Sequence, residues 1–224
     1  MSSKIETILF DLDGTLVDTE KAASVALTDL FNSWNISIVS EDANFITGRT
    51  WAAAFDYFYK KYPIPVPRET ALDEVMKIYR AGLERNLPIV PGSVAAVQSL
   101  ARSFKLALVS GSYRNEILWA LRKLKIESHF AVILGAEDYS RGKPAPDPYL
   151  SAIQLLKTKP QASLVFEDSQ AGITSALSAG TWVIAVTGTN HFAQDHTRAH
   201  HHITNLTNVT PEWVHQVSKK FQAK

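Results

Sequence analysis

Short runs of apolar residues recur along the chain and predict the strands of a buried sheet. Within each run apolar and polar positions do not alternate, which is the pattern of parallel strands that are buried on both faces. Between most of the runs, apolar residues recur every three or four positions, which predicts helices. The five runs cover residues 5–10, 106–109, 131–134, 164–166 and 182–186.

Three of the intervening stretches show a helical pattern, and two of them also carry start or stop signals of helices. In residues 93–102, Ser93 follows a Pro-Gly pair and is placed to cap the helix. Residues 115–124 repeat the apolar spacing, and residues 169–180 begin with a serine and end with a glycine. Because strands and helices alternate in this way, the sequence predicts an α/β fold, a doubly wound, Rossmann-like parallel sheet.

Residues 18–88 do not follow this alternation. They contain no strand pattern, are rich in helix formers and aromatic residues, and are interrupted by a cluster of prolines. We interpret this segment as an α-helical cap domain that is inserted after the first strand. The predicted domains are therefore an α/β core of residues 1–17 and 89–224 and a helical cap of residues 18–88.

Composition narrows the class of protein. The 224 residues are 46% hydrophobic and 20% charged, and the net charge is +1 at pH 7. This balance is typical of a globular protein and predicts neither a nucleic acid nor a membrane as partner. The absence of cysteine excludes disulfides and thiolate sites. No signal peptide or membrane-spanning run is visible, so we expect a cytoplasmic protein that is a monomer or a weak homo-oligomer.

Polar residues follow four of the predicted strands, at the edge where open α/β sheets bind ligands. Carboxylates that meet at one edge repel one another, so some of them must bind a cation or a proton. Without cysteine, and with no histidine nearby in sequence, oxygen ligands dominate and favour Mg²⁺. The residues are Asp11 and Asp13 after the first strand, Ser110, Gly111 and Ser112 after the second, Lys143 after the third, and Glu167 and Asp168 after the fourth.

The lysine and the serine of this set favour a substrate that carries a phosphate. Mg²⁺ in proteins usually keeps several waters and shares the oxygens of a bound phosphate. Lys143 suits the remaining phosphate oxygens by its charge, and Ser110 suits them as a hydrogen-bond donor. The set therefore predicts phosphoryl transfer from a small phosphate ester, a reaction in which positioning and charge neutralisation supply most of the catalysis.

Four segments resemble, in order, the motifs of the haloacid dehalogenase (HAD) superfamily of phosphohydrolases. They are Asp-Leu-Asp-Gly-Thr-Leu-Val-Asp at 11–18, Val-Ser-Gly-Ser at 109–112, Gly-Lys-Pro-Ala-Pro-Asp-Pro-Tyr-Leu at 142–150 and Val-Phe-Glu-Asp-Ser-Gln-Ala-Gly-Ile at 165–173. The helical insertion after the first motif resembles the small cap of the phosphoglycolate phosphatase and β-phosphoglucomutase branch. The resemblance covers the whole chain. It implies a Mg²⁺-dependent phosphatase that hydrolyses a sugar phosphate or a phosphoglycolate-like monoester through an aspartyl-phosphate.

The resemblance also implies roles for the acidic residues. Asp11 would be the nucleophile that takes up the phosphoryl group. Asp13 would protonate the leaving oxygen and then take a proton from the attacking water. The metal site would consist of Asp11, Asp13 through its backbone carbonyl, and Asp168, with Glu167 supporting the ion from beside Asp168.

Further residues of the motifs complete the implied site. Lys143 would offset the charge on Asp11 and on the transferring group, and Ser110 would hydrogen-bond the phosphoryl oxygens. Both belong to the implied catalytic set. Contacts with the substrate are expected from the turn of the first motif, from the cap and from the segment after the second strand. These residues are Gly14, Thr15, Gly48, Arg49, Gly111, Ser112 and Arg114.

Two other interpretations of the motifs stay open. The family's mutases, which isomerise β-glucose 1-phosphate, carry a histidine shortly after the first motif and a lysine in the cap. This chain has Ala23 and Thr47 at those places, so we favour hydrolysis. A non-catalytic binding or regulatory protein of the same fold would be expected to lose Asp11, Asp13 or Lys143, and none of them is lost.

Four histidines near the end of the chain raise the question of a zinc site. No carboxylate partner and no spacing typical of zinc ligands accompanies them, so we expect an exposed loop instead. They are His196, His200, His201 and His202.

Overall fold

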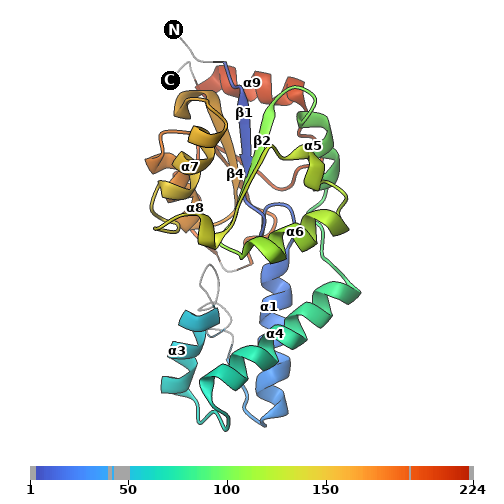
Figure 1. Ribbon diagram of the computed structural model, residues 1–224, viewed down its shortest axis with the longest axis vertical. Helices are drawn as coiled ribbons and strands as arrows, with labels where there is room; N and C mark the ends of the chain where they lie inside the picture. Colours follow the sequence, from blue (N-terminus) through green and yellow to red (C-terminus); the bar gives the residue numbers. More distant parts are fainter. Residues whose placement is uncertain (1–3, 40–41, 43–50, 192, 222–224) are drawn as a thin grey trace. The chain divides into compact units, whose positions relative to one another are not determined.

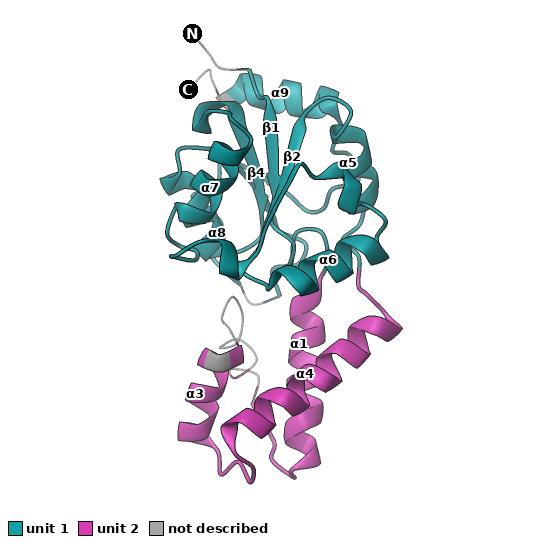
Figure 2. Ribbon diagram, viewed as in Figure 1, with its two compact units in different colours: residues 1–17, 89–224 teal, residues 18–88 magenta. Residues whose placement is uncertain are grey.

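The chain divides into two compact units, one of residues 1–17 and 89–224 and the other of residues 18–88 (Figure 2). Each unit buries a hydrophobic core of its own. That the smaller unit acts as a cap stays a prediction. The computed structural model describes residues 4–39, 42, 51–191 and 193–221.

Within the described residues, a sheet of six parallel strands forms the centre of the larger unit (Figure 1). The strand order is β3-β2-β1-β4-β5-β6, so β1 pairs with β2 on one side and with β4 on the other. The predicted α/β class with a doubly wound parallel sheet is confirmed. The strands are β1 (Thr7–Phe10), β2 (Lys105–Val109), β3 (Val132–Leu134), β4 (Ser163–Glu167), β5 (Trp182–Val186) and β6 (His201–Ile203).

Helices cover both faces of this sheet. They are α5 (Ser93–Leu100), α6 (Arg114–Lys123), α7 (Asp147–Leu155), α8 (Gln170–Ser178) and α9 (Pro211–Phe221), with 3-10 turns η1 (Glu127–His129), η2 (Ala136–Asp138) and η3 (Pro160–Ala162). Figure 1 shows α7 and α8 together on one side of the strands and α5 on the other. In the parts of the chain that the structure describes, no helix is long and apolar enough to cross a membrane.

The two faces explain why the strand runs are continuously apolar. Successive side chains of a strand point to opposite faces, so each buried strand supplies apolar groups to both. Leu9 of β1 belongs to the same core cluster as Ile173 of α8. Its neighbour Phe10 stacks on Phe166 of β4, with ring centroids 5.1 Å apart, and Phe166 in turn packs against Trp213 of α9.

The edge strand β6 is absent from the sequence prediction. It pairs in parallel with β5 through Ile184 and His201. Histidines lack the β-branched and aromatic signature of strands, which explains why the pattern did not reveal it. The expectation of an exposed loop is wrong for His196, which is 6% exposed, and for His201 and His202, which belong to β6.

The cap of α5 also differs from the prediction. Gly92, not Ser93, occupies the N-cap, and it adopts a left-handed conformation with φ of 81°. A Cβ atom at this glycine would lie 2.3 Å from the backbone of Thr207, so only glycine fits. The start of α8 is as predicted, because the Ser169 hydroxyl accepts a hydrogen bond from the backbone N–H of Gly172 at 3.0 Å.

The described residues of the smaller unit form helices and their connecting segments, and no strand lies among them, as the sequence pattern predicts. Its core is aromatic. Phe31, Phe55 and Phe58 are completely buried, and the rings of Phe31 and Phe58 meet edge to face with centroids 5.2 Å apart. The helices are α1 (Thr19–Ser33), α3 (Trp51–Lys61) and α4 (Arg68–Arg85).

The central strand should carry much of the stability of the larger unit. We expect Leu9→Ala to lower the free energy of unfolding by about 3 kcal/mol, because Leu9 is completely buried and its truncation leaves a cavity. Urea unfolding followed by circular dichroism measures this loss. The matched control is Leu155→Ala in α7, where the side chain is 58% exposed and the change should stay within about 0.5 kcal/mol. Equal losses in the two variants would contradict this account of the core.

Candidate active site

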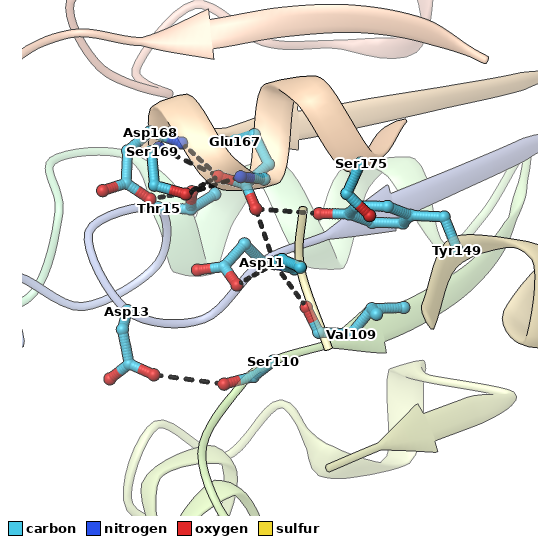
Figure 3. Close-up of polar contacts among 12 residues, drawn as sticks. Asp11, Asp13, Thr15, Val109, Ser110, Tyr149, Glu167, Asp168, Ser169 and Ser175 are labelled. Atoms are coloured by element: carbon cyan, nitrogen blue, oxygen red, sulfur yellow. Dashed lines mark hydrogen bonds and ion pairs between the residues drawn. The ribbon is translucent and has the colours of Figure 1, made fainter. Parts of the chain in front are cut away.

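The loops at the carboxyl ends of neighbouring strands bring the predicted site residues together (Figure 3). Asp11 and Asp13 follow β1, Ser110 follows β2, and Glu167 ends β4 just before Asp168. The chain order runs outward from β1 through β2 to β3 and then returns to the other side of β1 with β4. Such a reversal opens a crevice at the carboxyl edge of a parallel sheet, where ligands bind.

The Lys143 ammonium lies between two carboxylates. Its Nζ donates to Asp11 Oδ1 at 2.6 Å and to Glu167 Oε1 at 2.5 Å, and a third hydrogen bond of 3.2 Å runs to the backbone carbonyl of Val109. An ammonium group has three N–H donors. All three are therefore used inside the protein, and Lys143 links the ends of three strands.

Burial and the neighbouring charges shift the pKa values of Asp11, Lys143 and Glu167. Burial raises the pKa of Asp11 well above its ordinary value, and the charges of Glu167 and Asp13 raise it further against the opposing effect of Lys143. Burial alone would lower the pKa of Lys143, but the charges of Asp11 and Glu167 outweigh it and hold that pKa well above its usual range. Burial would also raise the pKa of Glu167, yet Lys143 holds it below its usual value. Lys143 and Glu167 are thus held in their charged forms, whereas burial and the neighbouring acids disfavour the charged form of Asp11.

Glu167 is completely buried and accepts hydrogen bonds at both oxygens. Besides Lys143, the hydroxyl of Tyr149 donates to Oε1 at 2.9 Å. The backbone N–H groups of Asp168 and Ser169 donate to Oε2 at 2.9 Å each, and the Ser169 hydroxyl adds a bond of 3.0 Å (Figure 3). A Cβ atom on Gly172 would lie 1.6 Å from Glu167 Oε1, so α8 leaves room for this carboxylate by carrying a glycine.

Asp168 occupies space beside the turn of the first motif. The Thr15 hydroxyl donates to Asp168 Oδ1 at 3.1 Å. Gly14 has a left-handed φ of +85°, and a Cβ atom there would lie 1.9 Å from Asp168 Oδ2. The Thr189 hydroxyl anchors the turn by donating to the Gly14 carbonyl at 2.6 Å. The glycine is therefore needed both for the backbone conformation and for the approach of the carboxylate.

Asp13 is held by the segment that follows β2. The hydroxyls of Ser110 and Ser112 both donate to Asp13 Oδ2, at 3.1 Å and 2.7 Å. The backbone N–H of Ser112 donates to Ser110 Oγ at 3.0 Å, and the hydroxyl of Tyr139 donates to the Ser110 carbonyl at 2.7 Å. The predicted substrate contact Ser112 is thus bonded to the predicted acid.

Other predicted substrate contacts are not joined to this group. Arg114 donates from Nη1 to Asp138 Oδ2 and to the Ile133 carbonyl, both at 2.9 Å, so its guanidinium ties α6 to β3 and η2. Gly111 is exposed, and the space that a Cβ atom would take is open. Gly48 and Arg49 lie outside the described residues. A substrate contact of these four residues stays a prediction.

Two residues that sequence reasoning missed belong to the same network. Tyr149 is completely buried in α7 and reaches Glu167 with its hydroxyl, and Tyr139 holds the carbonyl of Ser110. Burial raises the pKa of Tyr139 to about 12. Tyr149 stands inside the third motif segment, but its position in the apolar face of a helix gave no sign of a polar partner.

The donor groups fit a hard cation of the Mg²⁺ type. Among the described residues, no group of three or more His, Cys, Asp or Glu side chains is arranged to hold a metal ion. Mg²⁺, however, is commonly bound through one or two carboxylates, with waters and phosphate oxygens filling its other positions. Asp11 and Asp168 supply two carboxylates at this edge. Burial and the neighbouring acids raise the pKa of Asp11, so a nearby cation would favour its charged form.

The sequence matches that of known hydrolases. The family model for haloacid dehalogenase-like hydrolase covers residues 8–186. Hexitol phosphatase A of Escherichia coli is 32% identical over 180 residues, which are 80% of this chain and 81% of that protein. The bifunctional riboflavin kinase/FMN phosphatase of Arabidopsis thaliana is 31% identical over 186 residues, which are 80% of this chain and 48% of that protein. The chain thus spans about half the length of this bifunctional relative.

The fold matches as well. The crystal structure of β-phosphoglucomutase from Clostridium difficile aligns with a TM-score of 0.79 and 23% identity, covering 98% of this chain and 100% of that chain. At this identity the likeness shows the fold alone. The matched family segment contains all four motif segments and every carboxylate of the site. The chain therefore belongs to the family of haloacid dehalogenase-like hydrolases.

Proposed function

We propose that this protein is a Mg²⁺-dependent phosphatase that hydrolyses a small phosphate monoester through an aspartyl-phosphate intermediate. The observation that carries the proposal is the arrangement of Asp11, which is 6% exposed at the end of the central strand and receives a hydrogen bond from Lys143 at 2.6 Å. A carboxylate fixed in this way, with a second acid two residues further on, suits attack on phosphorus and transfer of a proton.

Asp11 and Asp13 would divide the reaction into two displacements. In the first, an oxygen of Asp11 forms a bond to phosphorus while the bond to the leaving oxygen breaks, and Asp13 gives its proton to that oxygen. In the second, water attacks phosphorus, Asp13 takes a proton from this water, and the bond between Asp11 and phosphorus breaks. The products are the alcohol and inorganic phosphate, and both carboxyl groups return to their initial states.

The lysine keeps the nucleophile in place. Its three N–H donors are bonded to Asp11, Glu167 and the Val109 carbonyl. We infer that Lys143 offsets the charge of Asp11 while phosphate approaches, since two negative groups must meet in a buried place. Ser110 is the hydroxyl that we expect to donate to the phosphoryl oxygens.

We propose that Asp11, Asp168 and the backbone carbonyl of Asp13 hold the Mg²⁺ ion. When bound, the ion would neutralise the negative charge of the carboxylates and of the phosphoryl oxygens. The assignment of Glu167 to the metal is revised, because the five hydrogen bonds that its oxygens accept already occupy both of them. We infer that Glu167 supports the site by orienting Lys143 and the backbone of Asp168.

The curated relatives support phosphate monoesters as the substrate class. One is named a hexitol phosphatase and the other carries an FMN phosphatase activity in its name. We therefore favour a sugar phosphate, with a phosphoglycolate-like ester as the second choice. The mutase alternative has less support, because the histidine position of the mutases is Ala23 here, which packs against the aromatic core of the smaller unit. Thr47, the other departure, lies outside the described residues.

Removal of the nucleophile gives the first test. We expect Asp11→Asn to lower kcat for 4-nitrophenyl phosphate on the order of 10³-fold, because an amide keeps the shape but cannot form the aspartyl-phosphate. Release of inorganic phosphate measures the loss. Asp73→Asn in α4 is the matched control, since this exposed acid should leave the rate unchanged. A variant at Asp11 that kept a tenth of the wild-type rate would rule out the covalent route.

Removal of the metal gives the second test. We expect exhaustive treatment with EDTA to abolish hydrolysis of 4-nitrophenyl phosphate and added Mg²⁺ to restore it. Ca²⁺ should restore it poorly, because its looser coordination misaligns the in-line displacement. Isothermal titration of the chelated protein with Mg²⁺ measures binding without activity. Undiminished turnover after chelation would show that the metal assignment is wrong.

Displacement of Glu167 gives the third test. A Cβ atom on Gly172 would lie 1.6 Å from Glu167 Oε1, so Gly172→Ala must move the carboxylate and with it Lys143. We expect kcat to fall about 10²-fold, as for a misplacement of about 1 Å. Gly82→Ala in α4 is the control, because nothing lies within 4 Å of its Cβ position. That variant should keep its rate and gain about 0.4–1 kcal/mol of stability. An unchanged kcat in Gly172→Ala would argue against the role of Glu167.

A further inference from the structure

Two serine hydroxyls are directed at the same oxygen of Asp13. Ser112 Oγ lies 2.7 Å from Asp13 Oδ2, and Ser110 Oγ lies 3.1 Å from it. A hydroxyl group has one proton to donate. In this arrangement each serine therefore donates its only hydroxyl proton to Asp13, and neither can donate to a phosphoryl oxygen at the same time.

The backbone after β2 holds Ser110 in place beside Asp13. The N–H of Ser112 donates to Ser110 Oγ at 3.0 Å, which occupies one lone pair of that hydroxyl and leaves its proton able to rotate between Asp13 and another acceptor. The Tyr139 hydroxyl donates to the Ser110 carbonyl at 2.7 Å and thereby holds the turn. With its pKa raised by burial to about 12, Tyr139 keeps this proton at neutral pH.

The two bonds to Asp13 are not equivalent. The distance of 2.7 Å from Ser112 is that of a well-formed O–H···O bond, whereas 3.1 Å from Ser110 lies beyond the usual range. Ser110 follows the strand directly and is completely buried, while Ser112 is partly exposed. The weaker bond is thus made by the serine that is assigned to the phosphoryl group.

We propose that Ser112 is a positioning residue for Asp13, holding its carboxyl group in orientation for proton transfer while Ser110 turns its hydroxyl to the phosphoryl group. This inference rests on the proposed phosphatase function. A hydrogen bond to a carboxylate is stronger than one to a neutral carboxyl group. The Ser112 bond therefore strengthens as Asp13 gives its proton to the leaving oxygen, and it favours the transition state over the bound ester.

The leaving group of the substrate provides the test. An alkoxide needs a proton as it leaves, whereas 4-nitrophenolate needs little help. For Ser112→Ala we expect kcat/KM to fall about tenfold with glucose 6-phosphate and less than about threefold with 4-nitrophenyl phosphate. The ratio kcat/KM reports the first displacement alone, so the later attack of water does not affect the comparison of the two esters. The inhibition constant of inorganic phosphate should stay within about twofold.

A second measurement separates positioning from substrate binding. In an Asp13→Asn background Ser112 has no acid to orient, so adding Ser112→Ala should not lower kcat/KM for 4-nitrophenyl phosphate further. A serine that bound the substrate would lower it in both backgrounds. Equal losses with the two esters, or a weaker inhibition by inorganic phosphate, would overturn the proposal and return Ser112 to the substrate.

Matched variants separate the loss of the Ser112 hydroxyl from an effect on folding. Ser112→Thr keeps a hydroxyl and should restore kcat/KM for glucose 6-phosphate to within about threefold of wild type. Ser112→Cys keeps the shape with a weak donor, and should repeat the alanine pattern if Ser112→Ala does not fold. Ser103→Ala, at an exposed serine before β2, should change nothing.

The two proposals can fail separately. Wild-type protein that hydrolyses neither ester with Mg²⁺ present would sink the phosphatase function itself. Active wild-type protein in which Ser112→Ala loses the same factor with both esters would sink only the assignment of Ser112.

Discussion

The charge of one buried ammonium holds the site together. Lys143 lies between Asp11 and Glu167, and its side chain is 11% exposed while theirs are 8% and 0% exposed. Carboxylates buried to this extent are stable only when they are paired and hydrogen-bonded. Removing one partner of a buried pair typically costs about 3–5 kcal/mol, because a charge is then left without compensation. The three strand ends that meet here depend on this lysine for their electrostatic balance.

One lysine cannot balance every acid at this edge. The charged form of Glu167 is stabilised more than that of Asp11, since Lys143 and four other donors bond to Glu167 and keep its pKa low. Asp11 is left with a raised pKa, and Asp168 receives a hydrogen bond from Thr15. In the proposed phosphatase, this imbalance favours the binding of a cation beside Asp11. A cation and a phosphate group together would complete the charge pattern, and Asp11 then faces phosphorus as a carboxylate.

Two glycines let the carboxylates approach the backbone. Cβ atoms on Gly14 and Gly172 would fall within 2 Å of Asp168 and Glu167 respectively, at 1.9 Å and 1.6 Å. The acids therefore occupy space that any other residue at these positions would fill. This packing fixes the carboxylates from the side of the backbone, while the hydroxyls of Thr15 and Tyr149 fix them from the other segments. Orientation of this kind lowers the cost of reaching the transition state.

The sequence by itself determined the class of fold and indicated the charged residues of the candidate site. Five strands followed from continuous apolar runs, because burial on both faces requires them. Asp11, Asp13 and Glu167 followed from charges placed at strand ends, and Lys143 followed from its place in the segment after the third strand. These signals are local and do not depend on contacts with distant segments of the chain.

Only the tertiary structure decided which groups meet. The hydrogen bond from Ser112 to Asp13 joins residues that are 99 apart in the chain. The hydrogen bond from Tyr149 to Glu167 comes from a residue whose sequence pattern predicts only a position in the hydrophobic core. The edge strand β6 and the cap at Gly92 likewise depend on β5 and on the approach of Thr207. A local pattern determines the type of a side chain and the face of the helix or strand on which it lies. Its hydrogen-bond partners come from distant segments that packing alone brings within 3 Å.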